Sequence, residues 1–250
     1  MIQKEDLSII FFINIIVNEE YKTFNELKNH DIEKAIYWEK IYQDIKSKSI
    51  ILYNDNSFTI DASYNKYAKF YPEFGKIISV TFAYMRNNLI NNNMIWDVQF
   101  KTLVDNTNSE YDNIIIPSAK SLTVFNDSSK KIKLCGYKLT HFIFKYFVKK
   151  YIMYDVEIPK LLRFWEQKPW ENQNIDLYNL LNVYTYNNTI SYELALKSMN
   201  INIINIDWDN INIYYNEHNF DKIKMYNEEF VKSEIKLCHK ISKSEIPLNI

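Results

Sequence analysis

Basic residues gather between positions 130 and 150, around and after the predicted strand 132–135, and could bind phosphate groups. Lysine side chains that neutralise phosphates release counterions, which supplies much of the affinity of nucleic-acid-binding proteins. The whole chain has 30 basic and 31 acidic residues, so its net charge of −1 shows no basic surplus. A solvated helix face and strand end is therefore favoured over a binding patch. The residues concerned are Lys130, Lys131, Lys133, Lys145, Lys149 and Lys150.

The two cysteines, Cys135 and Cys238, are far apart in the sequence and show no C-x-x-C or Cys/His spacing. Cys135 is expected to be a buried small hydrophobe, and no disulfide scaffold, metal or other cofactor is expected. The apolar residues 9–17 are too few to span a bilayer and lack a cleavage site. The sequence predicts a cytoplasmic protein without a membrane segment.

Composition indicates a folded chain, with 47% hydrophobic and 16% aromatic residues. Its 250 residues show no Pro/Gly/Ser-rich linker and no repeat, so a single domain over residues 1–250 is expected. The abundance of Asn, Ile, Lys and Tyr beside only 2 Gly is typical of an AT-rich genome. A bacteriophage or a reduced bacterial genome would fit this bias, and a protein of phage origin would be associated with the virion.

Hydrophobic patterns predict an α/β protein. Residues 9–17 are almost continuously apolar, as in a central strand covered on both faces. Residues 76–84 and 94–100 are expected to pair as an antiparallel meander, turned by the Asn-rich residues 86–93. Residues 50–60 have a polar centre between two apolar runs, which predicts an inserted hairpin. A further strand is predicted at 132–135, with helices in 23–47, 109–125, 141–153, 191–199 and 220–241.

Five short motifs are the most specific features of the sequence. In chain order they are residues 9–17 around Asn14, Phe70-Tyr71-Pro72-Glu73-Phe74-Gly75-Lys76-Ile77-Ile78, Cys135-Gly136-Tyr137-Lys138 with Phe142-Ile143, Lys168-Pro169-Trp170-Glu171 with Ile175-Asp176-Leu177, and Met225-Tyr226-Asn227-Glu228-Glu229-Phe230-Val231. Together they resemble, in the same order, the motifs of the predicted bacterial 3′–5′ exonucleases related to the proofreading domain of family B DNA polymerases. The resemblance implies a ribonuclease H-like fold, with a mixed central sheet, an antiparallel meander and flanking helices.

The same resemblance assigns the four metal-binding acids of these DEDD exonucleases to residues that are not acidic. Asn14 replaces the first Asp, Ile16 the Glu, Ile143 the motif II Asp and Phe230 the motif III Asp. A two-metal mechanism needs carboxylates around both ions, and magnesium prefers anionic oxygen ligands. The resemblance therefore implies that the metal site and the exonuclease activity are lost. Glu229, beside Phe230, could rescue the site only through a shift in register.

Four other residues are candidates for nucleic-acid binding near the former cleft: Lys138, His141, Lys145 and Tyr226. Lys138 could hold a phosphate as a point charge. For Tyr226, the family's motif III Tyr, a place in the core or groove is the plainer interpretation. A lone histidine is more often a surface or core residue, and Asp176 is expected to cap a helix or form hydrogen bonds.

Three functions remain open from the sequence. The leading hypothesis is an inactive exonuclease homologue that binds single-stranded or terminal DNA, or serves a replication or packaging assembly. The alternative is a structural subunit that binds proteins through a Tyr-rich surface, since 20 tyrosines suit protein interfaces. An active exonuclease with relocated metal ligands ranks third.

Overall fold

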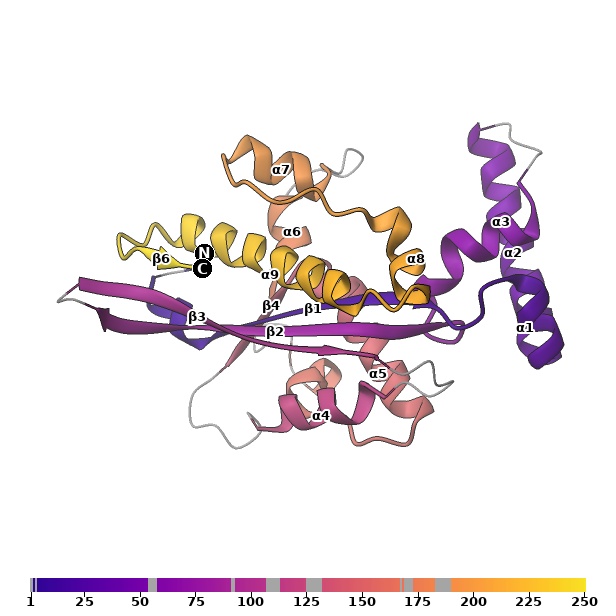
Figure 1. Ribbon diagram of the computed structural model, residues 1–250, viewed down its shortest axis with the longest axis horizontal. Coiled ribbons are helices and arrows are strands. Elements are labelled where there is room, and N and C mark those ends of the chain that lie inside the picture. Colours follow the sequence, from indigo (N-terminus) through magenta and orange to yellow (C-terminus); the bar gives the residue numbers. More distant parts are fainter. Residues whose placement is uncertain are drawn as a thin grey trace. The chain divides into compact units, whose positions relative to one another are not determined.

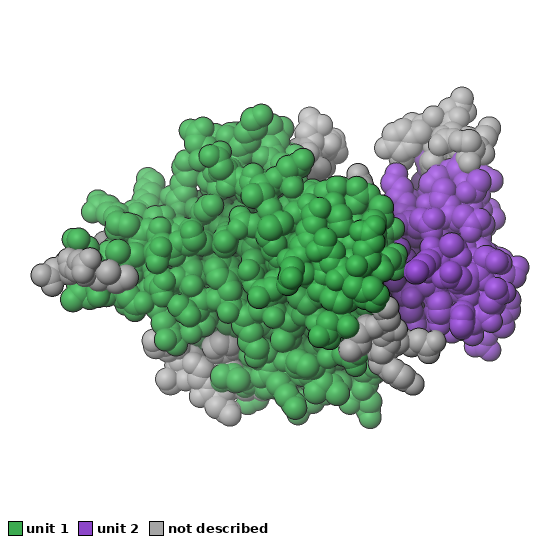
Figure 2. Space-filling model, viewed as in Figure 1, with its two compact units in different colours: residues 1–16, 78–250 green, residues 17–77 purple. Residues whose placement is uncertain are grey.

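The computed structural model divides into two compact units, coloured separately in Figure 2. Unit 1 consists of residues 1–16 and 78–250, and unit 2 of residues 17–77. The sequence predicts one domain, whereas both boundaries of unit 2 fall within strands of the sheet. The structure describes residues 2, 4–53, 58–90, 93–106, 113–124, 132–166, 168, 173–182 and 190–250.

A six-stranded mixed sheet forms the framework, with the strand order β5-β4-β1-β2-β3-β6 (Figure 1). Strand β1 pairs in parallel with β4, and β4 pairs in parallel with β5. Strands β2 and β3 pair antiparallel over their length, which confirms the predicted meander. The strands are β1 (Ile10–Glu19), β2 (Gly75–Ile90), β3 (Asn93–Val104), β4 (Lys133–Gly136), β5 (Ile175–Asp176) and β6 (Leu248–Asn249).

Helices cover both faces of the unit 1 sheet. Helix α9 runs along one face, and α4 and α5 lie on the other (Figure 1). No helix in the described ranges combines the length and apolar character that crossing a membrane requires. The helices are α1 (Phe24–His30), α2 (Ile32–Tyr53), α3 (Ile60–Tyr67), α4 (Ile115–Thr123), α5 (Phe144–Met153), α6 (Leu177–Leu181), α7 (Tyr192–Ser198), α8 (Ile211–Asn216) and α9 (Phe220–Ser242).

The main core of unit 1 lies between the sheet and α9. Alternate residues of β1, Ile10 and Phe12, point to this side, as Ala83 and Met85 of β2 do. They pack with an apolar stripe of α9 that includes Ile235. The two-residue period of the strands and the helical period of α9 together explain which residues are buried.

Unit 2 has its own core, built around Trp38 of α2. The indole is fully buried, and its ring centroid lies 5.2 Å from that of Tyr64 and 5.0 Å from that of Phe74. Both contacts are edge-to-face, the arrangement that the charge distribution of aromatic rings favours. An aromatic cluster therefore holds α1, α2 and α3 together.

The motif Phe70–Gly75 forms a tight turn within unit 2. The carbonyl of Tyr71 accepts hydrogen bonds from the N–H groups of Phe74 and Gly75, both at 2.9 Å. The carbonyl of Phe74 accepts from the N–H of Glu20, also at 2.9 Å. This motif therefore ties the start of β2 to the chain just after β1, which is a structural role.

The predicted hairpin at residues 50–60 is wrong where the structure describes it. Residues 50–53 continue α2, and residue 60 begins α3; residues 54–57 lie outside the described residues. β-Branched residues at 50 and 51 favour strands only weakly, and the long helix before them determines their conformation.

The predicted turn at residues 86–93 is also too long. Arg86 to Ile90 belong to β2, where Asn87 pairs with Trp96 and Asn88 with Ile95. The predicted helix at 23–47 is divided at Asp31 into α1 and α2. The remaining predicted strands and helices are present with boundaries shifted by a few residues, and within 109–125 the helix is α4, with Pro117 in its first turn.

Candidate functional site at the ends of the parallel strands

The carboxyl ends of β4 and β5 lie next to each other in the sheet, beside the first half of β1. Phe12 is level with Cys135, and Gly136 is level with Asp176. A side chain on Gly136 would not fit, because its Cβ would lie 2.6 Å from the carbonyl oxygen of Ile13. The close approach of two strands thus explains the glycine of the Cys-Gly motif. In α/β sheets this edge is the usual place for a binding site.

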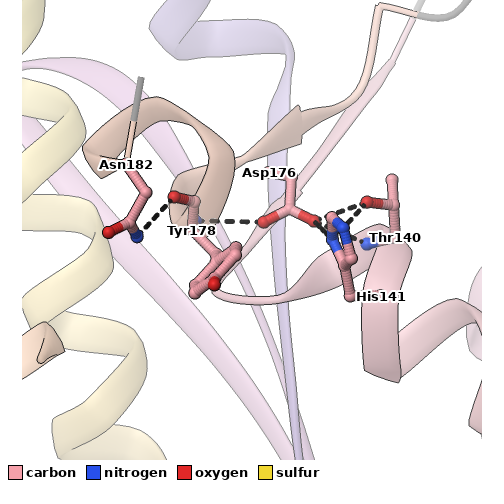
Figure 3. A network of polar contacts seen from close by, with 5 residues as sticks. All are labelled: Thr140, His141, Asp176, Tyr178 and Asn182. Carbon is pink, nitrogen blue, oxygen red and sulfur yellow. Dashed lines mark hydrogen bonds and ion pairs between the residues drawn. The ribbon is translucent and has the colours of Figure 1, made fainter. Parts of the chain in front are cut away.

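Asp176 organises the polar groups at this edge (Figure 3). Its Oδ1 accepts a hydrogen bond from the N–H of Tyr178 at 3.0 Å and so caps α6. Its Oδ2 accepts from the N–H of Thr140 at 2.8 Å and from the Thr140 hydroxyl at 2.6 Å. Nδ1 of His141 lies 3.3 Å from the same oxygen. One buried carboxylate therefore fixes the starts of two helical segments, as expected for a capping role.

The segment that Asp176 holds is a π-helical turn, Leu139–Ile143, which leads into α5. Lys138, just before it, adopts a left-handed conformation with φ 55°. Single π-helical turns are rare and often occur at functional sites. The side chain of His141 is 52% exposed, so this turn presents a titratable group at the surface.

Replacing Asp176 is expected to destabilise unit 1. Asp176→Ala removes a helix cap and leaves the N–H groups of Tyr178 and Thr140 without their acceptor, at a cost of about 2–4 kcal/mol. Asp176→Asn should cost about half as much, since its amide oxygen can still cap α6. Thr140→Val, which removes only the hydroxyl donor, is the matched control and should cost about 1 kcal/mol. Urea unfolding followed by circular dichroism measures all three.

Asn14 lies in a buried polar chain that joins three elements. Its Nδ2 donates to Oδ1 of Asn227 on α9 at 3.0 Å, and Nδ2 of Asn227 donates to Oγ of Ser79 on β2 at 2.8 Å. All three residues are buried. The neutral amide at position 14 therefore has a side-chain partner on α9.

Ile16 and Tyr226 belong to one buried apolar cluster. Ile211 and Tyr215 of α8 pack in the same cluster, which Ile78 and Ile223 complete. The exposed fractions of Ile16 and Tyr226 are only 3% and 5%. Helix α8 and the chain before it therefore fill the space beside Ile16, the position of the family's metal-binding Glu.

Phe230 is the centre of an aromatic cluster. Its ring centroid lies 4.9 Å from that of Tyr192 and 5.6 Å from that of Trp208. Tyr137, in the Cys-Gly motif, packs against Tyr192 at 4.5 Å. Ile143 is also buried. Three of the four positions that hold metal-binding acids in the resembling family are thus buried apolar side chains in this protein. No cluster of three or more His, Cys, Asp or Glu side chains suited to a metal ion is found among the described residues.

The candidate nucleic-acid residues fall into two places. Nζ of Lys138 lies 5.6 Å from the ring centroid of Tyr178, and His141 is beside the same ring, at 5.6 Å between centroids. Lys145 is exposed one helical turn after His141. Tyr226, however, is buried with Ile16 in the α8 cluster. The structure therefore brings Lys138 and His141 together at Tyr178 but places Tyr226 elsewhere.

The broader lysine patch is smaller than the sequence suggested. Lys150 is buried, with an exposed fraction of 2%, so it is not part of a solvated face. Lys133 forms an ion pair with Asp6 at 2.8 Å. Lys149 is exposed on α5, whereas Lys130 and Lys131 lie outside the described residues, as does most of the Lys168–Glu171 motif.

Sequence reasoning missed a buried group of titratable residues beneath this edge. The Sγ atoms of Cys135 and Cys238 are 3.6 Å apart, although the two thiols looked isolated in the sequence. Burial raises the pKa of Cys135 well above its ordinary value. Glu234 is fully buried and its Oε1 accepts from the N–H of Tyr137 at 2.6 Å. The spacing of Phe230, Glu234 and Cys238, four residues each, could have placed all three on one face of a helix.

Because of Glu234, the free energy of unfolding should decrease as the pH rises. Desolvation raises its pKa well above 4.5, although the Tyr137 N–H hydrogen bond lowers it, and its Oε2 has no hydrogen-bond partner among the described residues. The folded state therefore keeps a proton that the unfolded state releases above about pH 4.5. Over that range, up to the folded pKa, unfolding is favoured by as much as about 1.4 kcal/mol per pH unit.

The variant Glu234→Gln tests this pH dependence, because it keeps an acceptor for the Tyr137 N–H and cannot ionise. Its stability relative to the parent should grow from pH 5 to pH 8 in urea unfolding experiments. Glu229→Gln is the control, since Glu229 is a partly exposed residue of the same helix paired with Lys232. An equal pH profile for parent and Glu234→Gln would contradict a buried protonated carboxyl.

The mixed sheet with helices on both faces is a ribonuclease H-like fold, which confirms the predicted fold class. Neither a protein-family model nor a curated protein sequence matches the chain. Among solved structures, the chain is similar to the family B DNA polymerase from the hyperthermophilic archaeon Pyrobaculum calidifontis, with a TM-score of 0.54 and 11% sequence identity. The match covers 93% of this chain and 24% of the polymerase chain. At this identity the similarity concerns the fold alone.

Proposed function

We propose that this protein is a catalytically inactive homologue of a 3′–5′ DNA exonuclease that binds single-stranded or terminal DNA. It would serve as an accessory protein of a replication or packaging assembly. The proposal rests on the side chains at the four positions where the resembling family has its metal-binding acids. Asn14 is hydrogen-bonded to Asn227, while Ile16, Ile143 and Phe230 are buried apolar side chains.

Such an environment is unsuited to divalent ions. A two-metal site needs several carboxylates to balance four positive charges, and an apolar cavity offers neither charge nor hydration. Trp208 and Tyr192 occupy the volume around Phe230, and α8 covers Ile16. We therefore infer the loss of exonuclease activity from the side chains packed around Ile16 and Phe230 as well as from the missing acids.

DNA binding in this proposal uses exposed residues of the π-helical turn and α5, two of which are lysines. Lys138, His141 and Lys145 are exposed along this segment, and Lys138 and His141 lie near the ring of Tyr178. Ammonium groups hold phosphates, and a tyrosine ring can stack on an unpaired base. This combination favours single strands over duplex DNA.

The test is fluorescence anisotropy of an end-labelled single-stranded oligonucleotide at low salt in Mn²⁺. A saturable rise that persists for hours, with the oligonucleotide intact on a gel, is expected. The double variant Lys138→Gln/Lys145→Gln should weaken binding and reduce the slope of log K against log salt by about 1.4. Lys197→Gln on α7 removes an exposed lysine elsewhere and should change little. Shortening of the oligonucleotide by purified protein would overturn the proposal.

A protein-binding role is the second candidate, supported by apolar residues on unit 2. Ile32, Ile36 and Tyr37 of α2 are 52%, 47% and 62% exposed. Exposed apolar residues grouped on one helix are characteristic of interaction surfaces. No anisotropy rise, together with a specific cross-link from a photoreactive residue at position 37, would favour this role.

A further inference from the structure

A cavity of about 410 Å³ lies beside the start of β1. Its volume is within the range typical of small-molecule sites. It is formed by residues 8–11 at the start of β1, residues 84–88 of β2 and Ile132 just before β4. The residues important to the argument are Ser8, Phe11, Tyr84, Arg86, Asn87 and Asn88.

The cavity offers one cation and no acid among its described lining residues. Arg86 is exposed, and its guanidinium lies 5.0 Å above the ring centroid of Tyr84. Asp97 faces Arg86 across the β2–β3 pair, but the two form no ion pair in the described structure. The Asp97 carboxylate accepts hydrogen bonds from Asn88, Gln99 and Asn249. An anionic group is therefore the ligand that the charge of this cavity favours.

One wall of the cavity is aromatic. The ring of Phe11 stacks nearly parallel between two other rings. Its centroid lies 5.6 Å from that of Phe82 and 6.5 Å from that of Tyr84. Tyr84 is the half-buried member of the series, and Asn88, which also lines the cavity, projects to the same side of β2. Flat rings accept a nucleobase by stacking, and amides can form hydrogen bonds with its edge.

We propose that this cavity, which we call the Arg86 pocket, binds a nucleoside monophosphate, either free or as the phosphorylated end of a single strand. The base stacks beside Tyr84, and Arg86 turns from the ring to the phosphate. A cation–π contact at an exposed site is weak, whereas a guanidinium–phosphate pair forms strong, bidentate hydrogen bonds. The exchange is therefore favourable. This inference goes beyond the proposed DNA binding at Lys138 and Lys145 and does not depend on it.

Binding of adenosine 5′-monophosphate, measured by isothermal titration calorimetry, tests the pocket. Adenosine and inorganic phosphate should each bind at least tenfold more weakly, because each lacks one of the two recognised groups. Arg86→Gln should weaken binding of the monophosphate tenfold or more, and Tyr84→Leu should do the same. Tyr84→Phe, which keeps the ring and the packing with Phe11, should bind like the parent protein.

Single-stranded oligonucleotides distinguish the source of the ligand. A 5′-phosphorylated oligonucleotide that loses affinity in Arg86→Gln, while a 5′-hydroxyl oligonucleotide does not, identifies a strand end; a response of the monophosphate alone identifies a free nucleotide. Lys145→Gln should leave monophosphate binding unchanged, which separates this site from the DNA-binding proposal. Equal binding by Arg86→Gln and the parent, or phosphate binding as tight as that of the monophosphate, would overturn the inference.

Discussion

Restoring the missing acid at position 230 should unfold the protein instead of activating it. Phe230→Asp removes an aromatic ring that packs against Tyr192 and Trp208, a loss that alone costs about 3–5 kcal/mol. It also places a carboxyl group where aromatic rings surround it, which adds further cost whether the group ionises or remains neutral. The sum is about 5 kcal/mol or more, comparable with the whole stability of many domains.

Chemical denaturation and the near-ultraviolet signal of the aromatic cluster measure this effect. Phe230→Leu is the matched control, because it keeps an apolar side chain and should cost only about 1–2 kcal/mol. If Phe230→Asp were as stable as Phe230→Leu, the space around position 230 would have to be wet and tolerant of charge. That result would contradict a filled cleft, and a titration with Mn²⁺ would then be the next measurement.

Trp38→Ala should have the second large effect, confined mainly to unit 2. The indole is fully buried and makes edge-to-face contacts with Tyr64, Tyr71 and Phe74. Truncation to alanine costs about 3–5 kcal/mol through lost burial and the cavity that remains. Helices α1, α2 and α3 should consequently open far more often than α9 does.

Native-state hydrogen exchange resolves where the protein opens, since it reports the local free energy of each amide. In Trp38→Ala, protection should fall in residues 24–67 and change less in α9. Trp38→Phe retains a ring and removes an indole N–H that has no hydrogen-bond partner among the described residues, so its loss should be clearly smaller. A uniform loss of protection across both units would show that they unfold together.

The sequence predicted the central strand and α9 well because their patterns are long and local. Ten consecutive buried residues make β1, and a regular apolar stripe makes α9. The hairpin at residues 50–60 failed because a short β-branched run carries less information than the helix that precedes it. Asparagines 87 and 88 looked like a turn, yet pairing with β3 places them in a strand.

The candidate site was less accessible to sequence reasoning, because its contacts join distant segments. The resemblance located Asn14, Ile16, Ile143 and Phe230, but the rings that pack against Phe230 belong to the short 3-10 helix Trp208–Asn210 and to α7. The position of Asp176 between two helix starts depends on the register of β4 with β5. Likewise, nothing in the separation of Cys135 and Cys238 indicates a distance of 3.6 Å between their sulfur atoms.

The hydrogen bonds that link Asn14, Asn227 and Ser79 also favour one alignment of β1, β2 and α9. Apolar residues above and below it could pack in several alternative alignments at similar cost, because hydrophobic contacts are not directional. The two amides and the hydroxyl, however, satisfy one another in one alignment only, and a shift by a single residue in β1 would turn Asn14 to the other face. Misaligned forms would then bury unpaired amides. Three polar groups thus select a unique arrangement of two strands and a helix that the surrounding hydrophobic core alone would leave ambiguous.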